Sequence, residues 1–272
     1  MVKRLLKYII AIAVVSTVII ITFSRKNPVE TFYPRDYEGI IESGVIKAVT
    51  EYNAVSFYVE KGKVCGFDYE LLGAFAKEKG IKLEMTPEMS FEKRLEGVSQ
   101  GQFDMIALGT ATTSQLKDSL LFTHPLAIGK QVLIQRTDNE NHIKSALDMA
   151  GKTIYAVKDS PAIMRINNLM NEIADSIYVK EITEYGPEQL LAMVSAGDID
   201  YAVCDEMTAK AYIGNYKNLD MGTSISFNQF YSWGISRKAP VLLDSINSWL
   251  DRYIKTKEYK ALYDKYFNRK KH

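Results

Sequence analysis

Apolar and polar residues alternate along this chain with two different periods. Residues 81–85 alternate between apolar and charged side chains, which is typical of a half-buried strand. Just before them, apolar residues recur at helical spacing across 71–76, and Gly80 fits the position that follows a helix. Asp68 is the predicted N-cap of that helix. Strands separated by helices indicate βαβ units and a mostly parallel sheet, in which ligands bind beyond the carboxyl ends of the strands.

The same two periods predict the remaining elements of an α/β protein. We expect strands at 45–50, 131–135, 153–157, 177–179, 201–204 and 227–236, and a hairpin across 57–65. We expect helices at 37–43, after Phe91, and at 143–149, 161–174, 187–196, 240–254 and 258–267. Ser160 before Pro161 marks one helix start, because a serine N-cap and a proline in the first turn both favour it.

The N-terminal segment has the pattern of an export signal or a membrane anchor. Three basic residues precede an uncharged run at 8–23, and two more follow it. We interpret 1–26 as an uncleaved signal anchor with a transmembrane segment, because no small-x-small cleavage site follows the run. A cleaved signal peptide, which would release the protein into the periplasm, is the alternative. Residues 27–36, which contain two prolines, form the predicted tether.

The composition is that of a globular protein that does not bind nucleic acid. Of the 272 residues, 47% are hydrophobic. About 240 follow the N-terminal segment, enough for one large domain or two lobes. Five of the 34 basic residues precede Asn27, which leaves 29 basic residues against 33 acidic ones. A chain with this balance lacks the basic surface that nucleic-acid binding requires.

Little in the sequence points to catalysis, a cofactor or a metal. The three histidines, His124, His142 and His272, lie in no nucleophile motif, and neither Gly-x-Ser-x-Gly nor a phosphate-binding loop occurs. Cys65 and Cys204 have no histidine near them in sequence, so we expect no metal site. We therefore predict a protein that is not an enzyme and has no cofactor.

Four short motifs occur in a characteristic order between residues 66 and 125. They are Gly66-Phe-Asp before a helix, Gly101-x-x-Asp104 before a strand, Gly109 with a Thr-rich turn, and Phe122-Thr-x-Pro125. In order and spacing they resemble the bacterial extracellular solute-binding proteins of family 3, over about residues 37–267. A closer likeness is to the non-catalytic N-terminal module of membrane-bound lytic transglycosylase F, carried by Asp68-Tyr-Glu-Leu and by Asp198-Ile-Asp-Tyr ahead of Asp205.

The resemblance implies a two-lobed type II periplasmic-binding-protein fold with two hinge crossings. Lobe 1 would comprise 37–128 and 229–272, and lobe 2 would comprise 129–228. Two crossings make a hinge that permits closure about a ligand. The two cysteines would fall in different lobes, so we do not expect a disulfide. The catalytic glutamate of lytic transglycosylase F lies in a further domain, which we expect this chain to lack because it ends soon after the closing helices.

The best polar candidate for ligand binding is Asp205, which follows an apolar strand. In amino-acid-binding relatives the corresponding acid holds the ligand's ammonium group, whereas the simpler interpretation is a helix N-cap. Lys158 and Ser160 lie at a strand-to-helix turn where the family places ligand contacts, and a helix start there favours an anion. Plain capping by Ser160 is the alternative.

Aromatic residues are further candidates. Phe57 and Phe91 match positions that flank the ligand in relatives, and Tyr52 is a neighbour that could serve instead. With 17 tyrosines and 11 phenylalanines in the chain, core packing is the alternative for each of them.

The segment after Gly109 departs from the family pattern. Relatives that bind amino acids carry Thr two residues after this glycine and Arg seven residues after it, and the Arg grips the ligand carboxylate through paired, charged hydrogen bonds. Here Ala111 and Leu116 occupy those positions. Thr110 is a candidate to supply a substitute contact, and Leu116 stands where relatives have the Arg that grips the carboxylate. The departure argues against a standard α-amino acid as the ligand.

These observations predict a solute-binding protein that is tethered to the inner membrane and faces the periplasm. A small polar solute, with a peptide-like or cell-wall-derived molecule as one hypothesis, would be trapped between the lobes by hinge closure and would not react. The alternatives are the substrate-binding component of an amino-acid ABC importer, a small-acid dehydratase on the same scaffold, and a scaffold for a lytic transglycosylase. The corresponding partners are an ABC permease or a cell-wall enzyme.

Overall fold

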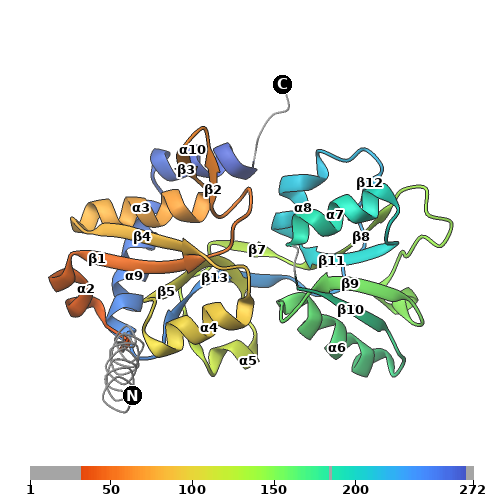
Figure 1. The fold of residues 1–272 in the computed structure, drawn as a ribbon, viewed down its shortest axis with the longest axis horizontal. Helices are drawn as coiled ribbons and strands as arrows, with labels where there is room; N and C mark the ends of the chain where they lie inside the picture. Colours follow the sequence, from red (N-terminus) through yellow and green to blue (C-terminus); the bar gives the residue numbers. More distant parts are fainter. Residues whose placement is uncertain (1–31, 184–185, 268–272) are drawn as a thin grey trace, which may run out of the picture. The chain divides into compact units, whose positions relative to one another are not determined.

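The computed structural model describes residues 32–183 and 186–267 (Figure 1). The chain separates into two units, 1–33 and 34–272, and every element below belongs to the second. The predicted anchor at 1–26 lies outside the described residues. Among the helices that are described, none combines the length and the apolar character that a membrane crossing requires.

The first sheet has six strands in two orientations. Its order is β4 (Lys82–Pro87), β1 (Val45–Thr50), β5 (Met105–Ala111), β13 (Gln229–Ser236) and β6 (Leu120–Phe122), and β7 (Ala127–Gly129) also pairs with β13. β1 is parallel to β4 and β5, whereas β13 runs antiparallel to β5, β6 and β7. A hairpin of β2 (Tyr58–Glu60) and β3 (Lys63–Cys65) stands apart from this sheet. The predicted βαβ arrangement and the hairpin are confirmed.

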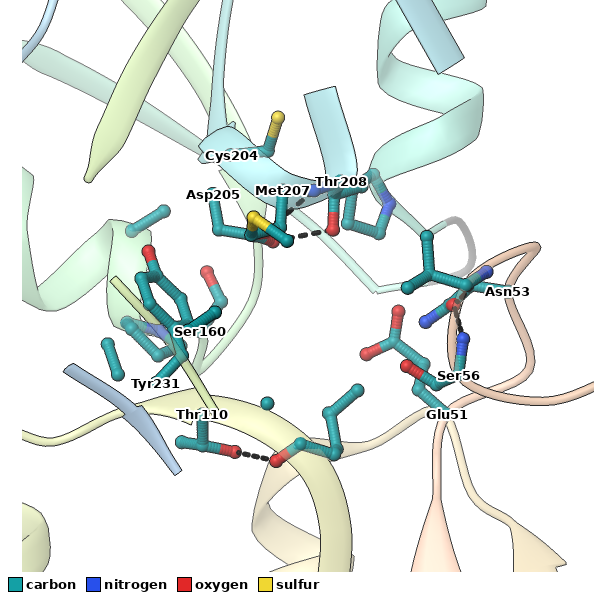
Figure 2. A pocket seen from close by; sticks show the side chains of 18 of the residues that line it. Glu51, Asn53, Ser56, Thr110, Ser160, Cys204, Asp205, Met207, Thr208 and Tyr231 are labelled. Atoms are coloured by element: carbon teal, nitrogen blue, oxygen red, sulfur yellow. Dashed lines mark hydrogen bonds between the residues drawn. The ribbon is translucent and has the colours of Figure 1, made fainter. Parts of the chain in front are cut away.

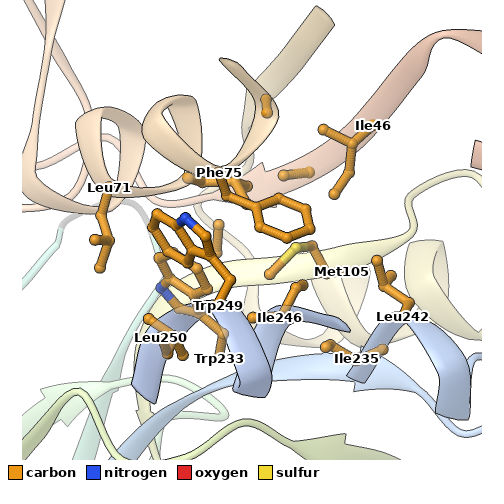
Figure 3. Close-up of a cluster of buried hydrophobic side chains, with 14 of the residues drawn as sticks. Ile46, Leu71, Phe75, Met105, Trp233, Ile235, Leu242, Ile246, Trp249 and Leu250 are labelled. Carbon is orange, nitrogen blue, oxygen red and sulfur yellow. The ribbon is translucent and has the colours of Figure 1, made fainter. Parts of the chain in front are cut away.

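Helices cover both faces of this sheet because successive side chains along its strands point to opposite faces, and both sets are apolar. Ala48 and Met105 face the cluster formed with α3 (Phe67–Lys79), α9 (Pro240–Tyr253) and α10 (Lys257–Phe267), and their neighbours Val49 and Ile106 face α4 (Phe91–Gln100). The largest side chains of the first cluster are fully buried (Figure 3). Trp249 packs edge-on against Phe75 with 5.5 Å between ring centres. Two short helices, α2 (Tyr37–Ser43) and α5 (Ser114–Lys117), complete the lobe.

The second sheet has five strands and is likewise covered on both faces. Its order is β10 (Tyr178–Ile182), β9 (Thr153–Val157), β11 (Tyr201–Asp205), β8 (Gln131–Arg136) and β12 (Leu219–Asp220). One buried cluster joins the sheet to α6 (Pro161–Ile173), and another joins it to α7 (Pro187–Ala196) and α8 (Glu206–Ile213). Successive side chains along β8 and β11 point to opposite faces of the sheet, so they alternate between the two clusters.

The chain passes between the two sheets twice. It leaves the first sheet between β7 and β8 and returns between β12 and β13. The two crossings lie side by side, because β7 and β13 pair at Gln229–Gly129 and Tyr231–Ala127. The two-lobed fold is therefore confirmed, and the exact lobe boundaries stay predictions.

Two predicted details of secondary structure are wrong. Helix α3 begins at Phe67 with Gly66 as its N-cap, so Asp68 lies inside the first turn, where its carboxylate accepts a hydrogen bond from Trp233 instead of capping. The predicted helix at 143–149 is only a 3₁₀ turn at Ala146–Met149. The Gln135 side chain binds both the N–H and the C=O of Ile143, which holds that residue out of a helix.

Candidate functional site

A cavity of about 130 Å³ lies between the two sheets, and both lobes line it (Figure 2). Lobe 1 contributes the loop after β1 and the end of β5, and lobe 2 contributes the end of β11 and the starts of α6 and α8. Most of these segments follow the carboxyl ends of strands, where open α/β sheets bind their ligands. The space holds several water molecules or one small organic molecule.

Asp205 stands on the lobe 2 side of the cavity, at the start of α8. Its carboxylate accepts the Thr208 amide at 2.8 Å and the Thr208 hydroxyl at 2.6 Å, so the predicted N-cap is confirmed. Burial raises the pKa of Asp205, and the hydrogen bonds from Thr208 oppose that rise. The carboxyl group is thus fixed in position while it still lines the cavity.

Glu51 and Arg94 form an ion pair on the lobe 1 side. Their Oε2 and Nη2 atoms lie 3.4 Å apart, and both side chains are largely buried. The Arg94 Nη1 donates to the carbonyls of Glu88 at 2.5 Å and Met89 at 3.0 Å. Burial raises the pKa of Glu51; the Arg94 charge lowers it and the Asp205 charge raises it, so carboxyl groups from the two lobes sense each other across the cavity.

Asp68 is the most deeply buried acid of the cavity lining. Its carboxylate accepts the Trp233 indole N–H at 2.6 Å, and only 3% of the residue is exposed. Burial raises the pKa of Asp68 to about 7, although Trp233, the Ser56 hydroxyl and the Gly109 amide all donate to it and act in the opposite direction. This residue therefore ties α3 to β13 and to the end of β5.

Asp104, which ends the Gly101-x-x-Asp104 motif, is not among the described residues that line the cavity. It accepts hydrogen bonds from Arg35 at 2.6 Å and from the Lys47 amide at 2.7 Å. These contacts tie the turn before β5 to β1.

The family is decided by a sequence comparison. Residues 45–269 match the model of the bacterial extracellular solute-binding proteins, family 3. The chain belongs to this family. The two-lobed fold and the cavity between the lobes agree with that membership.

The curated relatives of this family 3 protein share about a quarter of its residues. It is 27% identical over 245 residues to the membrane-bound lytic murein transglycosylase F of Alteromonas mediterranea, a match that covers 86% of this chain and 52% of the relative. It is 25% identical over 262 residues to the protein of that name from Desulfosudis oleivorans, a match that covers 92% of this chain and 56% of the relative. The chain thus spans about half the length of the curated relatives it matches.

Solved structures of amino-acid-binding proteins have the same fold. An ancestral arginine-binding protein bound to arginine matches with a TM-score of 0.72 at 25% identity, covering 82% of this chain and 98% of that one. A mutant of the arginine-binding protein of T. maritima matches with a TM-score of 0.76 at 23% identity, and the match covers 85% of this chain and 99% of that one.

Five of the nine candidate ligand-binding residues of this family 3 protein line the cavity. They are Phe91, Gly109, Thr110, Ser160 and Asp205. Ser160 occupies the N-cap position of α6, but its hydroxyl makes no capping bond and is buried without a partner among the described residues. Plain capping therefore does not account for this side chain. The Thr110 hydroxyl donates to the Leu108 carbonyl at 3.1 Å, within its own strand.

The other four candidates are not among the described residues that line the cavity. Phe57 is buried and packs edge-on against Tyr52, whose own side chain is 48% exposed. Leu116 is 5% exposed and lies in the short helix α5, and Lys158 is exposed. Ala111 does line the cavity.

Several residues of the cavity were missed by the sequence interpretation. Glu51 directly follows a predicted strand, and that position could have singled it out. Arg94 lies 43 residues away on a helix, and only the packing of α4 brings it to Glu51. Gln131 opens β8, opposite Asp205 in the antiparallel register. No sequence signal marked either Arg94 or Gln131.

Proposed function

We propose that this protein captures a small polar solute that carries an amino or similar cationic group, holds it between its two lobes by hinge closure, and does not alter it chemically. The observation that carries the proposal is the composition of the cavity. Glu51, Asp68 and Asp205 all line it, whereas Arg94 is the one basic side chain among its described lining residues. Buried carboxylates without enough positive charge favour a cationic guest.

Contacts across the cavity support the closure mechanism. The Ala54 amide in lobe 1 donates to the Tyr212 hydroxyl in lobe 2 at 2.5 Å. The loop before α7 also approaches lobe 1, because a Cβ placed on Gly186 would lie 3.3 Å from the Met89 Cε. Helix α10 of lobe 1 contacts α8 of lobe 2. A ligand that touches both lobes would favour this closed arrangement in proportion to its extra affinity for it.

The three carboxyl groups support binding rather than catalysis. Each is held by groups of the protein itself: Asp68 by Trp233, Asp205 by Thr208, and Glu51 by Arg94. A general acid or base needs a proton path to the substrate, and these bonds favour fixed electrostatic roles. A small-acid dehydratase on this scaffold would instead turn over candidate acids, and Asp205→Asn would abolish that turnover.

Isothermal titration calorimetry with a panel of amines, amino acids and cell-wall peptides tests the proposal. We expect at least one cationic member of the panel to release or absorb heat, and small-angle scattering to show a more compact protein when it is bound. The cell-wall peptides follow from the names of the relatives, and an importer role would accept an amino acid. A panel that produces no heat at all would overturn the proposal and favour a scaffold that docks a cell-wall enzyme.

The membrane tether is the second part of the proposal. It rests on the uncharged run at 8–23 and on the curated relatives, which are named as membrane-bound. We expect the full-length protein to sediment with inner membranes and to be digested by protease added to the periplasmic side. Recovery of a shorter protein in the soluble periplasmic fraction would show instead that a signal peptide is cleaved.

A further inference from the structure

Among the described residues that line the cavity, acidic groups outnumber basic ones, and the basic group already has hydrogen-bond partners. Three of these described residues carry carboxyl groups, and one carries a guanidinium group. That guanidinium is already engaged, because Arg94 donates to two backbone carbonyls and to Glu51. Its remaining nitrogen, Nε, has no partner among the described residues and is shielded from solvent. A ligand carboxylate brought to Arg94 would lie beside Glu51 and be repelled by it.

Two acceptors stand next to each other on the lobe 2 side. Gln131 and Asp205 are direct partners in the register of β8 and β11, so their side chains lie on the same face of the sheet. Gln131 is 2% exposed, and its Oε1 has no hydrogen-bond donor among the described residues, whereas its Nε2 donates to the Tyr231 hydroxyl at 3.1 Å. An unpaired buried acceptor beside a carboxylate calls for a ligand that supplies N–H groups.

None of the described lining residues replaces the lost carboxylate grip. Ala111 lines the cavity at one of the two positions concerned, and Leu116 at the other is packed in α5 away from the lining. Ser160 offers a hydroxyl group, but a neutral hydroxyl does not balance the charge of a carboxylate in a closed cavity. Apolar side chains such as Leu108, Leu126 and Met207 make up much of the remaining wall and suit a hydrocarbon body.

We propose that the ligand is an organic cation without a carboxylate: an amine or guanidine on a short apolar chain, rather than a zwitterionic amino acid. This inference rests on the proposed function and narrows its ligand class. The Asp205 and Gln131 acceptors bind the cationic head from lobe 2, and Glu51 adds negative charge from lobe 1. The carboxylate of an amino acid would be left without a charged partner in the same space.

Two matched pairs of solutes test this inference with the full-length protein. Arginine and agmatine differ only by the carboxylate, as do lysine and cadaverine. We expect calorimetry at one pH and ionic strength to give each decarboxylated member a Kd at least about tenfold lower than that of its amino acid. Equal affinity, or tighter binding of the amino acids, would overturn the inference and leave the proposed function standing.

A charge-removing variant supplies a second readout. Glu51→Gln keeps a side chain of the same size beside Arg94, and we expect it to weaken agmatine binding about tenfold and to narrow the difference from arginine. Glu92→Gln, an exposed residue on α4, is the matched control and should change neither value. If a solute without an amine binds and neither matched pair does, the inference is also refuted. If no solute binds at all, the proposed function itself is refuted.

Discussion

The Tyr212 hydroxyl joins the two lobes, so its removal tests whether lobe closure sets the ligand affinity. It accepts the Ala54 amide at 2.5 Å, and this contact crosses from lobe 2 to lobe 1. Tyr212→Phe deletes the hydroxyl, keeps the ring that packs among the buried residues of α8, and leaves the Ala54 amide without this acceptor. The hydroxyl also bonds Glu188 within lobe 2, a contact that both forms keep. Because the open form leaves the Ala54 amide in water, the change destabilises the closed form more than the open one.

The expected magnitude follows from the value of one hydrogen bond. A net contribution of about 1–2 kcal/mol, including the cost of the unpaired amide, corresponds to a factor of about 5–30 in the closed-to-open ratio. The Kd of the tightest solute in the panel should rise by that factor, and most of the rise should appear as faster dissociation. Small-angle scattering of the ligand-free variant should show a larger radius of gyration than the parent protein.

Tyr201→Phe is the control for this experiment. The Tyr201 hydroxyl donates to the Asn141 carbonyl at 2.7 Å, a bond contained within lobe 2. Its loss should lower the melting temperature without changing the Kd or the radius of gyration. If Tyr212→Phe behaves like Tyr201→Phe in both measurements, the contact does not hold the lobes together, and lobe closure through it does not set the ligand affinity.

Two further predictions concern stability. The pKa of Asp68 is raised from 3.8 to about 7, so the folded protein binds a proton more tightly than the unfolded chain. The free energy of unfolding should therefore fall by a few kcal/mol from pH 4 to pH 7. Asp68→Asn, which can still accept a hydrogen bond from Trp233, should reduce that fall in chemical denaturation, and an unchanged pH dependence would contradict the assignment. Gly66→Ala should destabilise the protein by more than about 2 kcal/mol, because φ is +139° and the new Cβ would meet the Ser56 carbonyl. Gly62→Ala, with φ of +76° and open space around it, should cost only about 1 kcal/mol, and equal losses would refute the steric argument.

The local elements were predictable because short-range patterns decide them. Strand β1 and helices α2 and α7 have the bounds expected from periodicity, and Gly80 ends α3 as expected. The errors occurred where distant side chains intervene. Gln135 binds the backbone of Ile143, and Trp233 takes the carboxylate of Asp68. Neither partner is visible in the local pattern, since the contacts span 8 and 165 residues.

The candidate site was predictable only in part, for a related reason. Asp205, Gly109 and Thr110 follow or end strands, so their place at the cavity follows from sheet topology. Lys158 meets the same topological condition, but its side chain is exposed instead. Whether a residue at a strand end faces the cavity depends on the rotation of the turn that carries it, and the sequence does not fix that rotation.

The sequence alone determined the family, the alternation of strands and helices, and the loss of the Arg and Thr positions after Gly109, because each is encoded in residue order. Tertiary structure alone decided that Arg94 and Glu51 pair, and that Gln131 stands beside Asp205 at the cavity wall. The physical reason is that charge balance in a cavity sums over side chains from segments far apart in the chain, and only packing brings those segments together.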